Sequence, residues 1–398
     1  MKNCRYKPMI EPRSTGRIVK VAVERQFFPM LTLVMAICLT PSFSASQSTS
    51  PGAFPSPAKT ATFPADFKMG QSNASFPVAS NGYLLSFSRS IQQALEPTSG
   101  IFMSSLTTSQ RSTIPFWVAS ASSIHLDAGA VTVGGNVLVA GSYLRSTSPQ
   151  DLQNFHQNPS QPQVSNFVAE LNASGLVSMH DLQGFTPERI CSASDKSFWV
   201  LGQQWPLEQS RKYFLLQHYS SSGTLIQAYL PHIGKPDSPD YRIRNGRGSH
   251  DAAFLICGDN SVGVFLQRTG GYVWAEIDLS GGNQEIRKVT ALPQAVPTGM
   301  ALFSRGTVYA SFRAVSHKDG ATSYGAPLGI YKLNMSQNQA FWQAVPGGSD
   351  ATPNSTLLGR HDGYLVHLKG TAGPVKDPTV YWTQVVQNSV TSAVRNQK

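Results

Sequence analysis

Residues 189–201 read RICSASDKSFWVL, and residues 213–230 read YFLLQHYSSSGTLIQAYL. Each stretch consists of an apolar run, a short turn rich in Ser, Asp, Lys or Gly, and a second run rich in apolar residues. Interruption of the apolar runs by polar residues is typical of half-buried antiparallel strands, and the turn residues suit tight hairpins. The two stretches together predict four antiparallel strands in succession.

The same two hairpins recur along the chain. Asn-Gly, Asp-Gly and Asp-Asn occur at several of the turns, and these residues tolerate the positive φ that hairpin turns require. Copies of the first hairpin lie at residues 78–85, 131–139, 189–201, 255–265, 301–310 and 357–366. Copies of the second hairpin lie near residues 167–175, 213–230, 272–282 and 330–334.

A four-strand unit repeated about every 45–65 residues is the pattern of a β-propeller blade. One blade cannot bury both of its faces, so blades stack in a ring. We therefore predict an all-β fold, a β-propeller of four-stranded antiparallel blades. Six blades are expected, with seven as the alternative because residues 100–126 are ambiguous. Residues 60–63 or 76–78 are expected to close the ring by completing a blade that contains residues 379–386.

The composition excludes other classes of protein. Charged residues make up 14% of the chain, which is too few for a long coiled coil or a helical repeat. Apolar residues make up 40%, which is enough to build a sizeable core and excludes a disordered chain.

Two stretches give the chain a resemblance to a known family. They are Asp195–Gly202, which reads DKSFWVLG, and Leu216–Leu225, which reads LQHYSSSGTL. With the repeat around them, they resemble the six-bladed propellers related to NHL repeats, especially secreted bacterial members of unassigned function. The resemblance covers residues 130–370 and implies the six-bladed fold. No Trp-Asp dipeptide ends the blades, so WD40 repeats are not indicated.

The N-terminus has the pattern of an export signal. Residues 1–44 contain seven Lys or Arg and two Glu, and residues 27–39 read FFPMLTLVMAICL. A basic stretch, a short apolar run and small residues before the cleavage site form a secretory signal peptide. The apolar run is too short for the roughly 20 residues of a membrane-spanning helix. We predict a secreted or periplasmic protein, with contact to the membrane only through this segment if it stays uncleaved.

The remaining segments follow from composition. Residues 45–66 form a Ser/Pro/Thr-rich spacer, residues 67–388 the propeller, and residues 389–398 a polar C-terminal tail. The net charge of +10 falls to about half once the basic N-terminus is removed. With export, this argues against nucleic acid as a partner.

Two cysteines follow the predicted signal peptide. Cys191 and Cys257 lie just before the first-hairpin turn in successive repeats. Equivalent positions of adjacent blades are neighbours, and an exported protein is exposed to oxidising conditions, so a disulfide is one interpretation. The other interpretation is a pair of buried thiols too far apart to bridge.

The loop at residues 241–251, YRIRNGRGSHD, is the predicted ligand-binding segment. Arg242, Arg244 and Arg247 would attract an anionic group such as a carboxylate or phosphate. His250 and Asp251 follow directly, although adjacent residues on a strand point to opposite faces.

No motif identifies a cofactor or a metal. His218, His232, His317 and His367 lack the spacing of metal ligands, and structural or surface roles are expected for them. Asp127, Glu170, Glu188, Glu276 and Asp278 form no recognisable carboxylate pair in the sequence. The sequence leaves open whether a divalent cation binds in the channel.

Three functional hypotheses follow. The first is an exported propeller that acts as a ligand- or protein-binding scaffold, its partner a small anionic ligand or another protein. The alternative is a hydrolase, lactonase or lyase whose active site lies at the channel mouth. An envelope-assembly component tethered by the spacer is the third. No catalytic motif is identified, which favours the first hypothesis.

Overall fold

The structure, a computed structural model, describes residues 59–62 and, with gaps, residues 78–384. The gaps are 89, 93–97, 109, 120, 147, 158–163, 205–211, 234–240, 243–252, 269–270, 319–320, 346–354, 362 and 370–378. All described residues belong to the unit formed by residues 49–398. The predicted signal peptide at 1–44 and the C-terminal tail at 389–398 lie outside the described residues.

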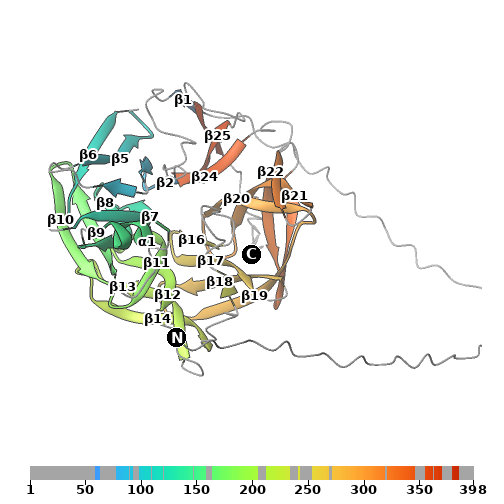
Figure 1. The fold of residues 1–398 in the computed structure, drawn as a ribbon. Coiled ribbons are helices and arrows are strands. Elements are labelled where there is room, and N and C mark those ends of the chain that lie inside the picture. The colour runs from blue at the N-terminus through green and yellow to red at the C-terminus, as the bar shows by residue number, and fades with distance from the viewer. Residues whose placement is uncertain are drawn as a thin grey trace, which may run out of the picture. The chain divides into compact units, whose positions relative to one another are not determined.

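The described strands form groups that follow one another in chain order (Figure 1). The first three groups are separate sheets with neighbouring strands hydrogen-bonded, and all of their pairings are antiparallel. The first group contains β2 (Val78–Ser80), β3 (Tyr83–Phe87), β5 (Thr98–Ser105) and β6 (Arg111–Phe116). The second contains β4 (Ser90–Gln92), β7 (Ser123–Val131), β8 (Val137–Leu144), β9 (Ser165–Asn172) and β10 (Gly175–Asp181). The third contains β11 (Phe185–Ser192), β12 (Phe198–Gln204), β13 (Lys212–Tyr219) and β14 (Leu225–Ile233).

The fourth and fifth groups share one nine-stranded sheet, because the outer strands β19 and β23 pair in parallel. The fourth contains β15 (Tyr241–Arg242), β16 (Ala253–Cys257), β17 (Ser261–Arg268), β18 (Gly271–Asp278) and β19 (Gln284–Thr290). The fifth contains β20 (Ala295–Leu302), β21 (Val308–Lys318), β22 (Ala321–Met335) and β23 (Gln339–Ala344). The sixth contains β24 (Ser355–His361), β25 (Tyr364–Lys369), β26 (Thr379–Gln384) and β1 (Lys59–Thr62). The helix α1 (Pro149–Gln157) joins β8 to β9.

One inner strand from each group takes part in a closed circle of contacts. Each contacts the next in the order β2, β7, β11, β16, β20 and β24, and β24 in turn contacts β2. Antiparallel sheets whose inner strands meet in a closed circle are the architecture of a β-propeller. The predicted fold class is therefore confirmed. The ambiguous residues 100–126 supply strands to the first and second groups and form no group of their own.

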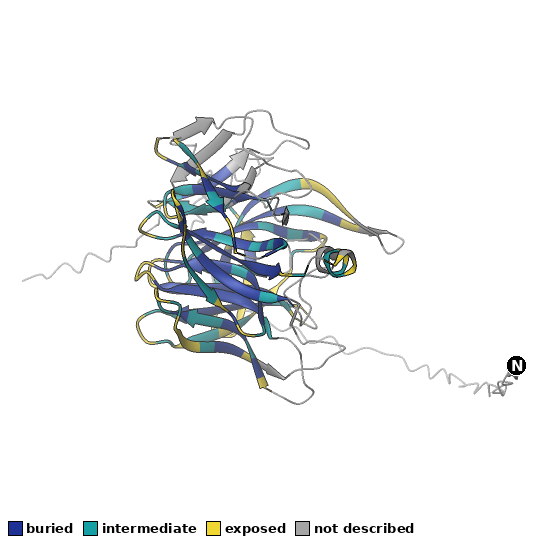
Figure 2. Cartoon of the chain, turned by 60° about the vertical axis from the view of Figure 1, so that its left-hand side comes forward, coloured by how far each residue is buried: buried dark blue, intermediate teal, exposed yellow. Residues whose placement is uncertain are grey.

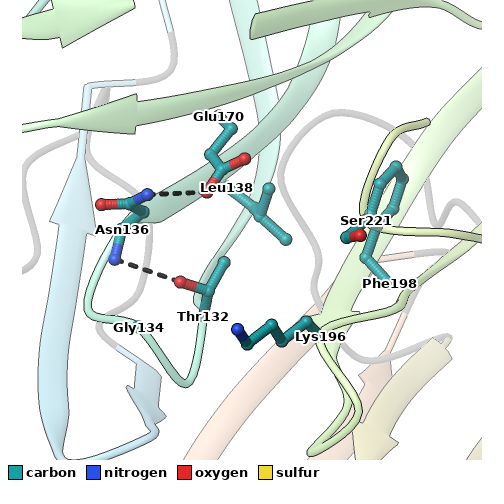
Figure 3. Close-up of a pocket in the computed structure, with 8 residues that line it drawn as sticks. All are labelled: Thr132, Gly134, Asn136, Leu138, Glu170, Lys196, Phe198 and Ser221. Atoms are coloured by element: carbon teal, nitrogen blue, oxygen red, sulfur yellow. Dashed lines mark hydrogen bonds between the residues drawn. The ribbon is translucent and has the colours of Figure 1, made fainter. Parts of the chain in front are cut away.

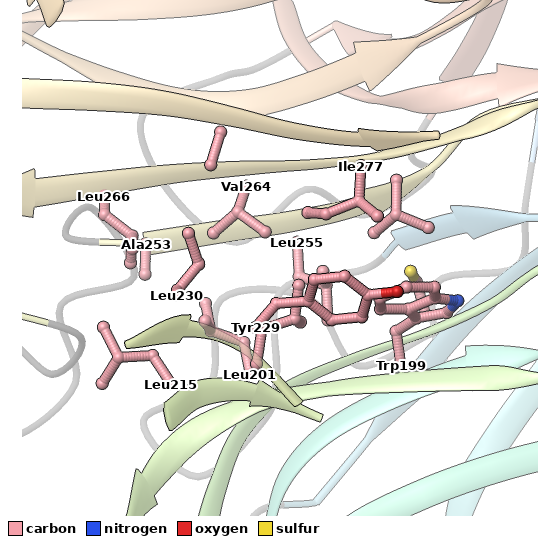
Figure 4. Packing of buried hydrophobic residues seen from close by; sticks show 14 of the residues in the cluster. Trp199, Leu201, Leu215, Tyr229, Leu230, Ala253, Leu255, Val264, Leu266 and Ile277 are labelled. Carbon is pink, nitrogen blue, oxygen red and sulfur yellow. The ribbon is translucent and has the colours of Figure 1, made fainter. Parts of the chain in front are cut away.

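The core lies between the faces of successive groups. Figure 4 shows one such layer, in which Trp199, Leu201 and Leu215 of the third group pack near Val264 and Ile277 of the fourth. Similar layers of buried side chains lie between the first and second, second and third, fourth and fifth, and fifth and sixth groups. Figure 2 shows the consequence, since buried residues follow the central strands and exposed residues lie at turns and outer strands. Each group is stabilised by its neighbours rather than by itself.

The ring is closed by a strand from the N-terminal side. β1 pairs with β26 in antiparallel register, with Thr60 opposite Tyr381 and Thr62 opposite Thr379. This is the first of the two closures predicted from the sequence. β1 lies within residues 45–66, so part of the segment assigned to the spacer belongs to the sixth group. Among the described residues, no helix is long and apolar enough to cross a membrane.

Candidate functional site

Bulges on two neighbouring inner strands hold acidic residues. The pairing register of β7 shifts between Leu126 and Ala128, at Asp127, and that of β11 shifts between Pro187 and Arg189, at Glu188. Gly141 and Gly202 stand opposite these bulges, and a Cβ there would lie 2.0 Å and 2.2 Å from a carbonyl oxygen of the bulged strand. Glycine inside a strand marks such a close approach of two backbones.

The two acids have different surroundings. Asp127 Oδ1 lies 3.2 Å from His125 Nε2 on the same strand. Glu188 is 7% exposed, and its carbonyl oxygen accepts a hydrogen bond of 2.6 Å from Arg189 Nη1. Within the part of the chain that the structure describes, no group of three or more His, Cys, Asp or Glu side chains is placed to hold a metal ion.

The predicted arginine loop falls largely outside the described residues. Arg242 belongs to the short strand β15, where it pairs with Gln267 of β17. Arg244, Arg247, His250 and Asp251 lie outside the described residues. The anionic ligand assigned to this loop stays a prediction.

The two cysteines form a disulfide. The bond joins Cys191 of β11 to Cys257 of β16, across a sequence separation of 66 residues, and their Cα atoms are 5.7 Å apart. It therefore links the inner strands of the third and fourth groups. Of the two interpretations left open by the sequence, the disulfide is the one that the structure confirms.

Two of the histidines for which the sequence predicts structural or surface roles are His218 and His367, and both lie in protected surroundings. His218 stacks on Trp199 with ring centroids 4.0 Å apart, and burial lowers its pKa while Asp195 opposes that shift. His367 is fully buried in β25, and burial lowers its pKa to about 4. Both side chains are therefore held in the neutral form near pH 7, which fits the structural role expected from the sequence.

A pocket of about 190 Å³ lies between the second and third groups (Figure 3). It is built mainly by hairpin turns: the β7–β8 turn, the β11–β12 turn and the β13–β14 turn, with β8, β9 and β12 contributing side chains. Its lining combines opposite charges, amide and hydroxyl groups and two apolar side chains. The lining residues are Thr132, Gly134, Asn136, Leu138, Glu170, Lys196, Phe198 and Ser221.

The two charges in the pocket are not paired with each other. Glu170 Oε1 accepts a hydrogen bond of 2.7 Å from Asn136 Nδ2, and no second donor to this carboxylate is found among the described residues. Lys196 is exposed, and within the same part of the chain its ammonium group has no hydrogen-bond or ion-pair partner. One carboxylate oxygen and one ammonium group are thus left for a ligand.

The equivalent junction between the fourth and fifth groups is closed by a hydrogen bond from one group to the next. Glu276 holds the place in β18 that Glu170 holds in β9, since each is followed two residues later by the Asp or Asn that caps the next turn. Glu276 is 2% exposed and receives hydrogen bonds from Ser261 Oγ at 2.8 Å and Trp274 Nε1 at 3.1 Å. It also accepts the N–H of Gly306, in the turn of the next group, at 3.0 Å.

The two glutamates therefore bond in different directions. Glu276 reaches across to the neighbouring turn and accepts the N–H of Gly306 there. Glu170 instead bonds Asn136 within its own group, and the neighbouring turn presents the side chain of Lys196.

Lys196 adopts a backbone conformation that is unfavourable for its residue type. Its φ is 70°, in the left-handed region, where Gly135, Gly223 and Gly306 stand in comparable hairpin turns. A residue with a Cβ in this region is strained, and such strain gathers at functional sites.

None of the pocket residues is predicted as a site residue from the sequence, where Glu170 appears only among acids without a recognisable partner. The pocket is lined by strands and turns from two different repeats, and no sequence motif spans both of them. One signal was present: aligned turns carry Gly at the position where residues 193–197 carry Lys196.

Comparison with known proteins gives similarity of structure only. No family model matches the chain, and no curated protein matches it. Similar solved structures include the RRP9 WD40 repeats, 7% identical over 83% of this chain and 99% of that chain, with a TM-score of 0.43. The Malassezia sympodialis allergen Mala s 1 is 11% identical over 84% of this chain and 96% of that chain, with a TM-score of 0.40. Oligogalacturonate lyase from Vibrio parahaemolyticus is 10% identical over 79% and 77% of the two chains, with a TM-score of 0.41.

Proposed function

We propose that this chain is an exported six-bladed β-propeller that serves as a binding scaffold for a small polar ligand. The observation that carries the proposal is the pocket between the second and third groups, where Glu170 and Lys196 keep unpaired charged atoms beside apolar Leu138 and Phe198. A concave, partly apolar site with a few convergent polar groups is the usual form of a small-molecule site.

Six blades are supported by the circle of inner strands. Its members β2, β7, β11, β16, β20 and β24 each come from a different strand group, and β24 meets β2 again. The resemblance to NHL-related propellers belongs to the same proposal.

Export is supported by the N-terminal pattern of residues 1–44 and by the disulfide. A bond between Cys191 and Cys257 persists in oxidising compartments such as the periplasm or the extracellular space. A secreted or periplasmic location fits both features.

The test is a thermal-shift screen of the full chain against amino acids, monosaccharides, small carboxylates and small amines. Ligand present at a hundred times its Kd stabilises the folded state by about 2.7 kcal/mol. Ser221→Trp fills the pocket, whereas Ser222→Trp adds the same side chain to the same turn at a position that does not line it. We expect at least one class to raise the Tm of the wild type and Ser222→Trp but not of Ser221→Trp. If no class does so, the pocket is not a ligand site.

The arginine loop supports a second contact of the same scaffold. Arg242, Arg244 and Arg247 would hold an anionic group of a small molecule or of a protein partner. The test replaces all three arginines by Gln. Retention of this variant on an anionic resin is compared with that of wild type at fixed salt.

A propeller enzyme is the second candidate, and one observation favours it. Asp127 and Glu188 stand at bulges of two contacting inner strands, and bulges are frequent beside active sites. A channel-bound divalent cation would belong to this version. The metal content of the purified protein, dialysed without chelator, decides its metal-dependent form. One calcium or zinc per chain supports it, and a folded metal-free protein overturns it.

A further inference from the structure

We propose that the pocket between the second and third groups recognises a small zwitterion, a molecule of amino-acid size with one ammonium and one carboxylate group. The inference rests on the proposed function of this pocket as a ligand site and names the chemical class of the ligand.

The charges argue for a ligand with both signs. Glu170 offers a carboxylate oxygen that lacks a donor among the described residues, and Lys196 offers an ammonium group that lacks an acceptor there. No ion pair joins the two side chains, although both line one small pocket. A ligand ammonium beside Glu170 and a ligand carboxylate beside Lys196 would satisfy both, and charge-assisted hydrogen bonds are the strong ones.

The shape of the pocket limits the size of the ligand. Its volume of about 190 Å³ lies below the 300 Å³ at which sites for drug-sized ligands typically begin. In Figure 3, Leu138 lies between Glu170 and Lys196, so an apolar surface separates the two charges. A short aliphatic part of the ligand would rest on this surface.

A sugar fits the same lining less well. Sugar sites commonly present an open aromatic face, and Phe198 is the one aromatic residue of this pocket. Phe198 is 3% exposed, and its ring stacks on Tyr219 with centroids 5.2 Å apart and on His180 at 6.5 Å. Its ring faces are therefore covered by protein.

The closed junction shows what satisfies this carboxylate when no ligand is needed. Glu276, at the equivalent place, is satisfied by Ser261, by Trp274 and by the backbone N–H of Gly306. At the open junction, the residue that corresponds to Gly306 is Lys196. The chain thus replaces an internal contact by a cationic side chain, and the ligand would take the place of that contact.

The experiment is titration calorimetry on the full chain with three probes of similar shape: L-leucine, 4-methylpentanoate and L-leucinamide. The first is zwitterionic, the second has only the carboxylate, and the third has only the ammonium group. We expect L-leucine to bind at least tenfold more tightly than either of the others, because each lost charged contact is worth about 1.5 kcal/mol or more. Equal affinity for all three probes, or no affinity for L-leucine, overturns the inference.

Variants assign the binding to the two charges. Glu170→Gln should weaken L-leucine binding by about tenfold or more and bring its affinity close to that of 4-methylpentanoate. Lys196→Met should do the same relative to L-leucinamide. Lys288→Met is the matched control, because Lys288 is an exposed lysine on the outer strand β19 and lies outside the pocket. Unchanged affinity in both pocket variants overturns the inference.

The result also separates this inference from the proposed function. If another class, such as monosaccharides, stabilises the wild type but not Ser221→Trp, the pocket is a ligand site. The assignment of a zwitterionic ligand to it is then wrong. If no class depends on Ser221, both proposals fail together.

Discussion

Lys196 occupies the same turn position as Gly306, two strand groups further along the chain. Both turns close with a backbone bond, from Ala193 N to Ser197 O at 2.9 Å and from Phe303 N to Thr307 O at 3.0 Å. The φ angles of Lys196 and Gly306 are 70° and 76°. One sequence therefore uses a lysine and a glycine for one backbone conformation, and the lysine is the more costly choice.

The first prediction is that Lys196→Gly stabilises the fold and weakens ligand binding. A residue with a Cβ in the left-handed region destabilises the folded state by about 1–2 kcal/mol. Glycine removes this strain, but it loses more conformational entropy on folding, so the net gain is smaller. We expect the free energy of unfolding in urea to rise by about 1 kcal/mol, while the affinity for the pocket ligand falls as in Lys196→Met.

Lys196→Asn is the control for this prediction. Asn tolerates the left-handed region but carries no charge, so it should weaken binding as Lys196→Met does, with a smaller gain in stability. A destabilised Lys196→Gly variant would contradict the strain argument, whatever its affinity.

The second prediction compares the two equivalent glutamates. Glu276→Gln leaves at least one of the groups that donate to Glu276, among them Trp274 Nε1 and Gly306 N, without an acceptor in a buried place. An unsatisfied buried donor costs about 1–3 kcal/mol, so the free energy of unfolding should fall by about 2 kcal/mol. Glu170→Gln keeps an acceptor for its single donor, Asn136, and should change stability by less than about 0.5 kcal/mol. Equal effects of the two changes would show that the junctions do not differ as described.

The hairpins were readable from the sequence because their signals are local. Alternation in residues 213–230 and turn chemistry at residues 193–197 each operate within a few positions, and the repeat of hairpins predicts the ring. Closure by β1 is one of the two alternatives that the sequence offers for the last blade, the other being residues 76–78.

The pocket was not readable, because its geometry depends on contacts between groups. Whether Glu170 turns toward Asn136 or toward the next group depends on packing that no single repeat encodes. The bulge at Asp127 is similar, since it faces Gly141 on the neighbouring strand, where a Cβ would meet the backbone. The arginine loop shows the reverse case, a strong local pattern whose surroundings lie outside the described residues.

The third prediction concerns the disulfide. Loss of the Cys191–Cys257 bond frees a loop of 66 residues in the unfolded chain, which the chain-entropy model values at about 4 kcal/mol. The double change of both cysteines to Ser should lower the free energy of unfolding by about that amount. Wild type in dithiothreitol should match the double variant, and dithiothreitol should not affect the variant itself. A variant as stable as the oxidised wild type would show that the bond adds nothing.

The fourth prediction is a pH dependence of stability below neutrality. The pKa of His367 is about 4 in the folded chain and 6.5 in the unfolded chain, and burial lowers the pKa of His218 as well. Below pH 6.5 the unfolded state therefore binds more protons than the folded state, so stability is lost as pH falls. For His367 the loss amounts to about 3 kcal/mol by pH 4.

Urea unfolding at pH 7, 6, 5 and 4 measures this dependence. His367→Gln keeps a polar side chain that does not titrate in this range, so its stability should fall less steeply between pH 6.5 and 4 than that of wild type. Parallel curves for the two proteins would contradict the assignment to His367.

The fifth prediction is that β1 is part of the fold. A chain that begins after residue 62 lacks the strand that pairs with β26, and leaves an open sheet edge with unpaired N–H and C=O groups. The loss of its few ladder hydrogen bonds should lower the free energy of unfolding by about 2 kcal/mol and increase aggregation. A chain that begins at Thr49 retains β1 and should match the full chain in urea unfolding and in light scattering. Equal stability of the two shortened chains would show that β1 does not close the ring.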